Sequence, residues 1–229
     1  MGGLKPNRAR YWARRLARHA LIAASSGVAG IGCWTLIPST DAIFKLSLTS
    51  AYVSLGLLAV TLVIGPLNLV RRRPNPTSTD LRRDFGIWTA IVATLHTFAG
   101  LQVHLRGKMW RYFLASISPP TPNLSAFGAA NYAGLVATLL LLLLLAISND
   151  LSLRTLGTIR WKQTQRWVYA AAVLIVGHGV LYQLVERRYG AYSVTLGAVT
   201  LAVALVQWRG YRMVTNGTRA ASGSTRRKG

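Results

Sequence analysis

Six long apolar segments divide the chain, and short polar stretches separate each from the next. They cover residues 19–37, 46–70, 85–105, 129–147, 167–185 and 191–208. A bilayer crossing needs about 20 apolar residues, and backbone groups inside lipid must pair within the segment, so each should be an α-helix. The alternation with period two that marks a membrane barrel is absent. The pattern therefore predicts an all-α integral membrane protein, a six-helix transmembrane bundle.

Composition and charge placement agree with a multi-pass protein. The 229 residues are 52% hydrophobic, with 27 basic and only 5 acidic residues, for a net charge of +22. This charge could indicate nucleic-acid binding, but 21 basic residues lie in the two terminal segments and in the second and fourth loops. Basic residues gather on the cytoplasmic side and contact anionic lipids. We therefore expect a bacterial inner-membrane protein with both termini in the cytoplasm and no nucleic-acid partner.

Three regions follow from this layout. Residues 1–18 form a basic cytoplasmic tail, residues 19–208 the six-helix domain, and residues 209–229 a basic, disordered cytoplasmic tail. Ser25, Ser26 and Gly27 could imitate a signal-peptide cleavage region, but five further spans follow, so we expect the first span to be retained. The single cysteine, Cys33, excludes an intramolecular disulfide.

Two histidines lie deep in separate apolar segments. His96 follows Arg83 by 13 residues, and His178 follows Arg166 by 12. At 1.5 Å per residue, both lie about 18 to 20 Å from the inner boundary, so they should be level with each other. An ionisable side chain at this depth is costly without a partner. The pair therefore predicts a site that clamps a flat metal cofactor between the third and fifth spans.

Small residues surround this pair. Gly177 and Gly179 flank His178, and Gly100 lies one turn beyond His96. They would let a wide ring approach the backbone, although ordinary close helix packing is the alternative. Two axial histidines on a b-type haem leave no open iron position, which favours electron transfer over oxygen binding.

The other two histidines are expected at the membrane boundaries. His19 lies at the basic edge of the first span. His104 follows His96 by eight residues, which places it roughly 80° round the helix. We therefore interpret both as interfacial residues rather than axial ligands.

Several stretches resemble the ferric reductase-like transmembrane domain family. They are RRDFG (residues 82–86) followed by Leu95 and His96, LRTLGTIRWKQTQRWVY (residues 153–169) followed by His178, and LTSAYVSLGLLAVTLVIGPL (residues 48–67). The similarity covers roughly residues 45 to 185. It is closest to the haem-binding membrane subunit of the bacterial periplasmic methionine sulfoxide reductase system. The resemblance implies a six-helix bundle with haem b held by His96 and His178.

The chain departs from that family where an inner haem would bind. Gln165 stands where relatives usually carry a histidine 13 residues before the one matching His178. In two-haem relatives, the opposite ligand matches Arg82 or Arg83. An amide is a poor iron ligand, and a guanidinium cannot donate a lone pair. We therefore expect one haem.

Electrons need a route to a haem about 20 Å from the cytoplasmic edge. No glycine-rich nucleotide fingerprint follows a buried strand, so we expect quinol from the bilayer, or a flavin bound at the inner face, to be the donor. Gln165, Arg166 and Trp167 are candidates to line that input site. The alternative is an ordinary interfacial belt of basic and aromatic residues.

Three basic residues on the outer side, Arg106, Lys108 and Arg111, could pair with haem propionates or with an acidic partner. They could equally contact lipid head groups. The leading interpretation is a membrane cytochrome subunit that passes electrons to an outer-face acceptor or partner reductase. A non-redox transporter or assembly factor, and a self-contained metal or oxygen reductase, are the alternatives.

Overall fold

The computed structural model describes residues 8–71, 79–105 and 108–226. Its helices are α1 (Arg8–Leu36), α2 (Ala42–Val70), α3 (Thr79–Val103), α4 (Ala126–Ala146), α5 (Asp150–Gln165), α6 (Trp167–Val185) and α7 (Ala191–Arg226). Six helical segments, one of them combining α5 and α6, are long and apolar enough to cross a membrane. The prediction of an all-α, six-helix transmembrane bundle is confirmed, and the protein is a multi-pass membrane protein.

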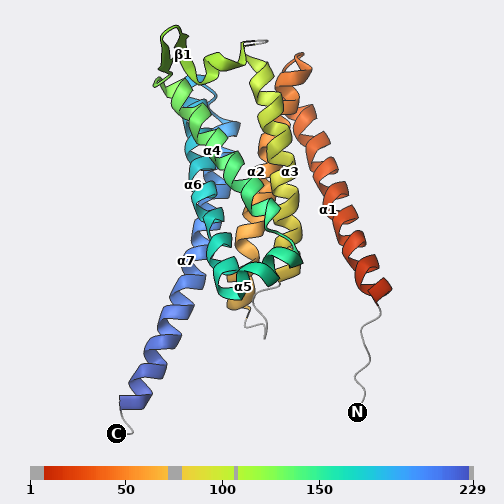
Figure 1. Cartoon of the computed structure of the whole chain (residues 1–229), viewed down its shortest axis with the longest axis vertical. Coiled ribbons are helices and arrows are strands. Elements are labelled where there is room, and N and C mark those ends of the chain that lie inside the picture. Colours follow the sequence, from red (N-terminus) through yellow and green to blue (C-terminus); the bar gives the residue numbers. More distant parts are fainter. Residues whose placement is uncertain (1–7, 72–78, 106–107, 227–229) are drawn as a thin grey trace.

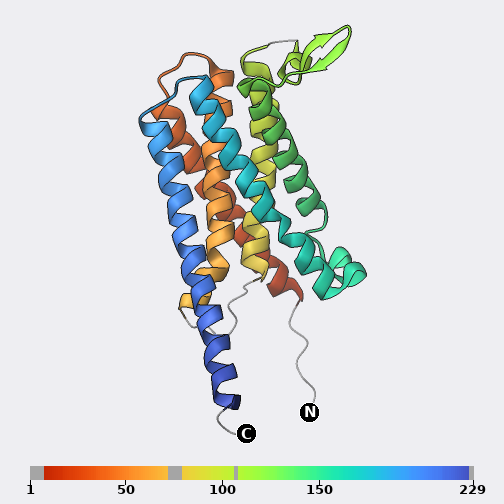
Figure 2. The same ribbon diagram turned by 90° about the vertical axis from the view of Figure 1, so that its left-hand side faces the viewer.

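The helices form a bundle with two distinct ends (Figures 1 and 2). One end, here called the α5 end, contains the start of α1, the short helix α5 and the end of α7. The opposite end, here called the hairpin end, contains the 3-10 helix η1 (Met109–Tyr112) and an antiparallel hairpin of β1 (Leu114–Ile117) and β2 (Pro120–Pro122). α1 packs on α2 and α3 at the edge of the bundle.

Side-chain caps fix where three of the helices begin. Asp41 accepts hydrogen bonds from the backbone N–H groups of Ile43 and Phe44 at the start of α2. Ser125 caps α4 and Asn149 caps α5 in the same manner. Such caps satisfy N–H groups that have no partner within the first helical turn.

Pro66 lies inside α2, where its ring removes a hydrogen bond to the carbonyl four residues earlier. That carbonyl belongs to Leu62, and the Gln207 side-chain amide of α7 donates to it at 2.8 Å. A Cβ on Gly210 would come within 2.8 Å of the Pro66 Cβ, so the glycine allows α7 to approach this closely. The proline is thus accommodated by the helix that packs against it.

The structure differs from the sequence interpretation in three segments. α1 begins at Arg8, ahead of the span predicted from residue 19, and α7 continues to Arg226, past the span predicted to end at residue 208. Residues 150–165, interpreted as a loop, form α5, which bends at Gly157 (φ 71°). Neither extension contains a proline, so each helix can continue beyond the apolar stretch by which the spans were defined.

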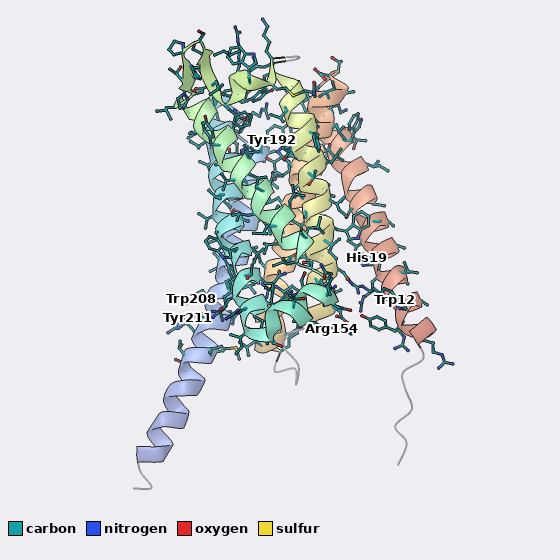
Figure 3. All side chains as sticks on the ribbon, viewed as in Figure 1. Trp12, His19, Arg154, Tyr192, Trp208 and Tyr211 are labelled. Carbon is teal, nitrogen blue, oxygen red and sulfur yellow. The ribbon has the colours of Figure 1, made fainter. Side chains whose placement is uncertain are left out.

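Exposed aromatic side chains mark the part of the bundle near the α5 end. Trp12, Trp208 and Tyr211 all lie in this region (Figure 3), and each is more than half exposed. Tryptophan and tyrosine favour the boundary between lipid and water. Their position is that of an interfacial aromatic belt.

Candidate functional site

The rings of His96 and His178 lie together inside the bundle, with ring centroids 5.9 Å apart. His96 projects from α3 and His178 from α6, and both line one cavity. The structure therefore brings together the two histidines that the sequence places at equal depth.

Each imidazole is oriented by a backbone carbonyl of a neighbouring helix. Nδ1 of His96 lies 2.8 Å from the Ser47 carbonyl of α2, and Nδ1 of His178 lies 2.8 Å from the Ala130 carbonyl of α4. Because a carbonyl can only accept, Nδ1 must carry the proton in both rings. The lone pair of each neutral ring is then on Nε2, the atom left to bind a metal.

The donor set at this site suits a haem better than a bare metal ion. A metal bound by both rings, with metal–nitrogen bonds of about 2 Å, would place the ring centres about 6 Å apart, which agrees with the 5.9 Å between the two centroids. In the part of the chain that the structure describes, no cluster of three or more His, Cys, Asp or Glu could hold a metal ion. Two imidazoles are an incomplete set for a bare ion, but they complete the coordination of a haem iron.

The cavity around the pair is lined mainly by apolar and small side chains. Its walls come from α2, α3, α4, α6 and the start of α7, and include Leu55, Ala93, Leu135, Ala137, Ile175 and Leu196. Such a lining favours an apolar ring over a small polar ligand.

Two of the three glycines predicted to lie beside the pair line the cavity. Gly100 and Gly179 line the cavity, whereas Gly177 does not line it and is exposed. Sequence reasoning missed Gly134 of α4, where a Cβ would lie 2.7 Å from Nδ1 of His178. Gly134 therefore provides the space for the His178 ring. No local signal identifies it, because His178 lies on another helix.

The basic side chain that lines the cavity at the hairpin end is Arg188, which the sequence analysis did not select. Arg106 lies outside the described residues, while Lys108 and Arg111 are exposed and do not line the cavity. Arg188 does line it, as does His104. His104 is thus more than a boundary residue.

A second cavity lies toward the α5 end. Arg82, Arg83, Gln165 and Arg166 line it, together with Lys162, Trp161 and Tyr169. The positions where relatives would hold an inner haem thus surround one space. Trp167 does not line it and is exposed.

The two cavities share one lining side chain. Leu141 of α4, only 4% exposed, lines both of them. It packs with Ala90, Ala93 and Ala171 in a buried cluster. A molecule in the second cavity would therefore lie one side-chain layer from the cavity of the histidine pair.

Arg83 is already engaged by the fold. Its Nε donates to the Ser148 carbonyl and its Nη1 to Asp150, both at 2.7 Å. Gln165 donates to the Ser148 hydroxyl at 3.4 Å. These contacts tie α3 and α5 to the end of α4, so Arg83 and Gln165 close the second cavity on that side.

His19 belongs to a separate polar cluster between α1 and α3 (Figure 3). Asp84 is fully buried. Its Oδ2 accepts a hydrogen bond from Nε of Arg18 at 3.0 Å and also lies 3.0 Å from Nη2 of Arg18. Nε2 of His19 lies 3.3 Å from Asp84, and Arg15 lies 3.6 Å from it. Trp88 donates to Nδ1 of His19 at 3.1 Å. The cluster attaches α1 to the bundle, away from the paired histidines.

Comparison with known families gives an independent assignment. The family described as ferric reductase like transmembrane component matches residues 48–176, which include His96 and end two residues before His178. The match covers more than half of the chain, so the chain belongs to the ferric reductase-like transmembrane family. A search of the curated proteins found no match. Membership in this family indicates a membrane redox component.

Proposed function

We propose that the protein is a membrane b-type cytochrome subunit that holds one haem b between His96 and His178. The observation that carries this proposal is the pairing of the two rings 5.9 Å apart, each with Nδ1 directed at a backbone carbonyl. When bound there, a haem would alternate between ferric and ferrous iron and so carry single electrons.

The protein side chains define what this site would do. His96 and His178 would hold the haem through Nε2, and a haem held by two histidines would supply electron transfer rather than oxygen binding. The apolar lining, including Ala93 and Ile175, keeps water away. The arrangement supports electron transfer rather than oxygen chemistry, and a subunit of an oxidoreductase system rather than a complete enzyme.

We propose that electrons arrive through the second cavity, from quinol or from a flavin bound at the α5 end. Gln165, Arg166 and Tyr169 would contact the donor there. The position of Leu141 between the cavities supports this, because a donor in contact with it is far closer to the histidine pair than one outside the membrane. Trp167 would instead contact lipid at the interface.

Electrons would leave at the hairpin end, toward an outer-face acceptor or a partner reductase. The resemblance to the haem-binding subunit of the bacterial methionine sulfoxide reductase system supports a partner of this kind. Basic residues concentrated at the terminal segments and α5 support a cytoplasmic location for the α5 end, in a bacterial inner membrane. Residues 19–208 would then be the haem-binding domain.

Proteoliposomes test the direction of transfer. Protein of known orientation is supplied with reduced quinone or reduced flavin, and the reduction of the haem is monitored by its absorption. Ferricyanide cannot cross the membrane, so it serves as an acceptor that is placed on one side at a time. We expect reoxidation only when ferricyanide is on the hairpin side, and none in His178→Ala. Reoxidation only from the α5 side would contradict the proposal, and steady oxygen reduction in the absence of ferricyanide and of a partner would favour a self-contained reductase.

A further inference from the structure

We propose that Arg188 binds the haem carboxylates, so that the propionates point toward the hairpin end. Glu186 would position Arg188, and His104 would be a second polar group at the same place. The proposal rests on the proposed function, because it concerns how the haem held by His96 and His178 is oriented. It replaces the expectation that Arg106, Lys108 and Arg111 would do this.

The charge distribution in the cavity favours this orientation. Among the described residues that line it, Arg188 is the only lysine or arginine, and no aspartate or glutamate lines it. The rest of the lining is largely apolar, and an unpaired carboxylate buried there would be costly. Two propionates therefore have their favourable place beside Arg188, where His104, Gln183 and Tyr192 add polar groups.

Glu186 holds both groups at the cavity mouth. Its Oε2 lies 3.3 Å from Nη2 of Arg188, and its Oε1 lies 3.4 Å from Nε2 of His104. The Arg188 guanidinium also lies over the Phe44 ring, 4.7 Å from its centroid. A guanidinium has five N–H donors, so the contact with Glu186 leaves donors for a second carboxylate. Glu186 is thus a positioning residue.

Two ring contacts connect this mouth to the histidine pair. The His104 ring stacks on Tyr182 with a 21° angle between planes, and Tyr182 lies 4.9 Å from the His178 ring. The hydroxyl of Tyr182 donates to Asn131 at 2.7 Å. Ring contacts through Tyr182 therefore link the mouth to the imidazole of His178.

The rate of haem transfer from the purified holoprotein to excess apomyoglobin measures how strongly Arg188 holds the haem. Arg188→Gln should release haem about tenfold faster or more, the loss expected for a charge-assisted hydrogen bond. Arg187→Gln is the matched control, because it removes the same charge from an adjacent, exposed residue that does not line the cavity. Equal rates in the two variants would overturn the proposal.

Infrared difference spectra report the carboxylates directly. With haem labelled with carbon-13 at the propionates, oxidation-linked carboxylate bands should shift in Arg188→Gln and stay unchanged in Arg187→Gln. A purely structural role for Arg188 would leave these bands unchanged and would overturn the proposal. If Arg188→Gln does not accumulate, Arg188→Lys provides the same test, with an expected shift because lysine lacks the planar fork.

A double-variant cycle tests the role of Glu186. Glu186→Gln should accelerate haem release in the wild-type background and add little in Arg188→Gln. Equal acceleration in both backgrounds would contradict positioning through Arg188. Failure of the proposed function looks different, since the wild-type protein would then contain no haem to transfer.

Discussion

At the scale of single residues, the informative feature is how the two imidazoles are held. The Ser47 and Ala130 carbonyls, on α2 and α4, receive one N–H each from histidines on α3 and α6. Four helices therefore determine the orientation of two rings. Nδ1 of each ring is engaged by its carbonyl, which leaves Nε2 as the nitrogen able to bind a metal.

The first prediction concerns the axial ligands. His96→Ala and His178→Ala should each abolish stable low-spin haem, because each removes one of two axial bonds. His19→Ala is the control, since His19 contacts Asp84 and Trp88 between α1 and α3, away from the paired histidines. Optical and electron paramagnetic resonance spectra provide the measurement. A low-spin signal that survives in either ligand variant would exclude this pairing.

The second prediction compares Gly134, which lies against the His178 ring, with Gly177, which is exposed. Gly134→Ala should displace the His178 ring, because the added Cβ would lie 2.7 Å from its Nδ1, and haem content should fall severalfold. Gly177→Ala meets no atom within 4 Å and should leave haem content unchanged, with a helix about 1 kcal/mol more stable at most. Haem-to-protein ratios after identical purification measure both. The reverse order of effects would contradict the placement of His178.

The sequence was sufficient to identify the histidine pair, since depth can be counted from the basic boundary. It also singled out Gln165, Arg82 and Arg83, and the structure places all three on the wall of the second cavity. Gly134, Arg188 and Glu186 could not be identified in this way, because their significance depends on side chains from other helices. Arg188 appeared only as one more outer charge, and nothing in its neighbourhood indicates that it faces a cavity.

At the scale of elements, α1 is attached through buried charge. Most of its surface is exposed, as expected for a helix that contacts lipid, and its polar contacts converge on Asp84. A carboxylate buried without partners would be strongly unfavourable. The arrangement couples the position of α1 to α3, the helix that carries His96.

The third prediction compares two acidic residues. Asp84→Asn should destabilise the protein by about 3 kcal/mol, because it leaves Arg15 and Arg18 without their buried counter-charge. Asp150→Asn should cost only about 0 to 1 kcal/mol, because its side chain is 64% exposed beside Arg83. Thermal unfolding in detergent measures both as shifts in Tm. Equal shifts would show that burial of Asp84 does not govern the attachment of α1.

The apolar pattern identified every span, because the membrane requires helices of a minimum length. It could not give the full length of α1 or α7, because the apolar stretch ends at the lipid boundary whereas the helix continues into polar sequence. It also missed α5, whose sequence is polar and contains Gly157 in a left-handed conformation.

At the scale of the whole molecule, the two ends differ in structure and in charge. The α5 end contains the start of α1 and the end of α7 (Figure 1), and the sequence places most basic residues in its segments. The hairpin end carries far fewer. The two ends can therefore be assigned to different sides of the membrane. The second cavity lies toward the α5 end, and Arg188 lies toward the hairpin end.

The fourth prediction tests this direction in cells. Reporters fused after Arg73, after Lys162 and at Gly229 should all report the cytoplasm, and one inserted near Pro120 should report the outer side. Fusions to a periplasmic enzyme and to a fluorescent protein provide paired readouts. A reversal at any of the four sites would overturn the orientation or the number of spans.

The central claim is a single haem held by two histidines, and the most direct test is the absorption spectrum of purified protein together with its haem content. We predict a Soret band, sharp α and β bands on reduction, and one haem per chain by the pyridine haemochrome assay. The reason is that His96 and His178 form one complete ligand pair, whereas Gln165, Arg82 and Arg83 offer no second. A colourless preparation after expression with ample haem would contradict the cytochrome assignment, and a ratio near two would contradict the single site.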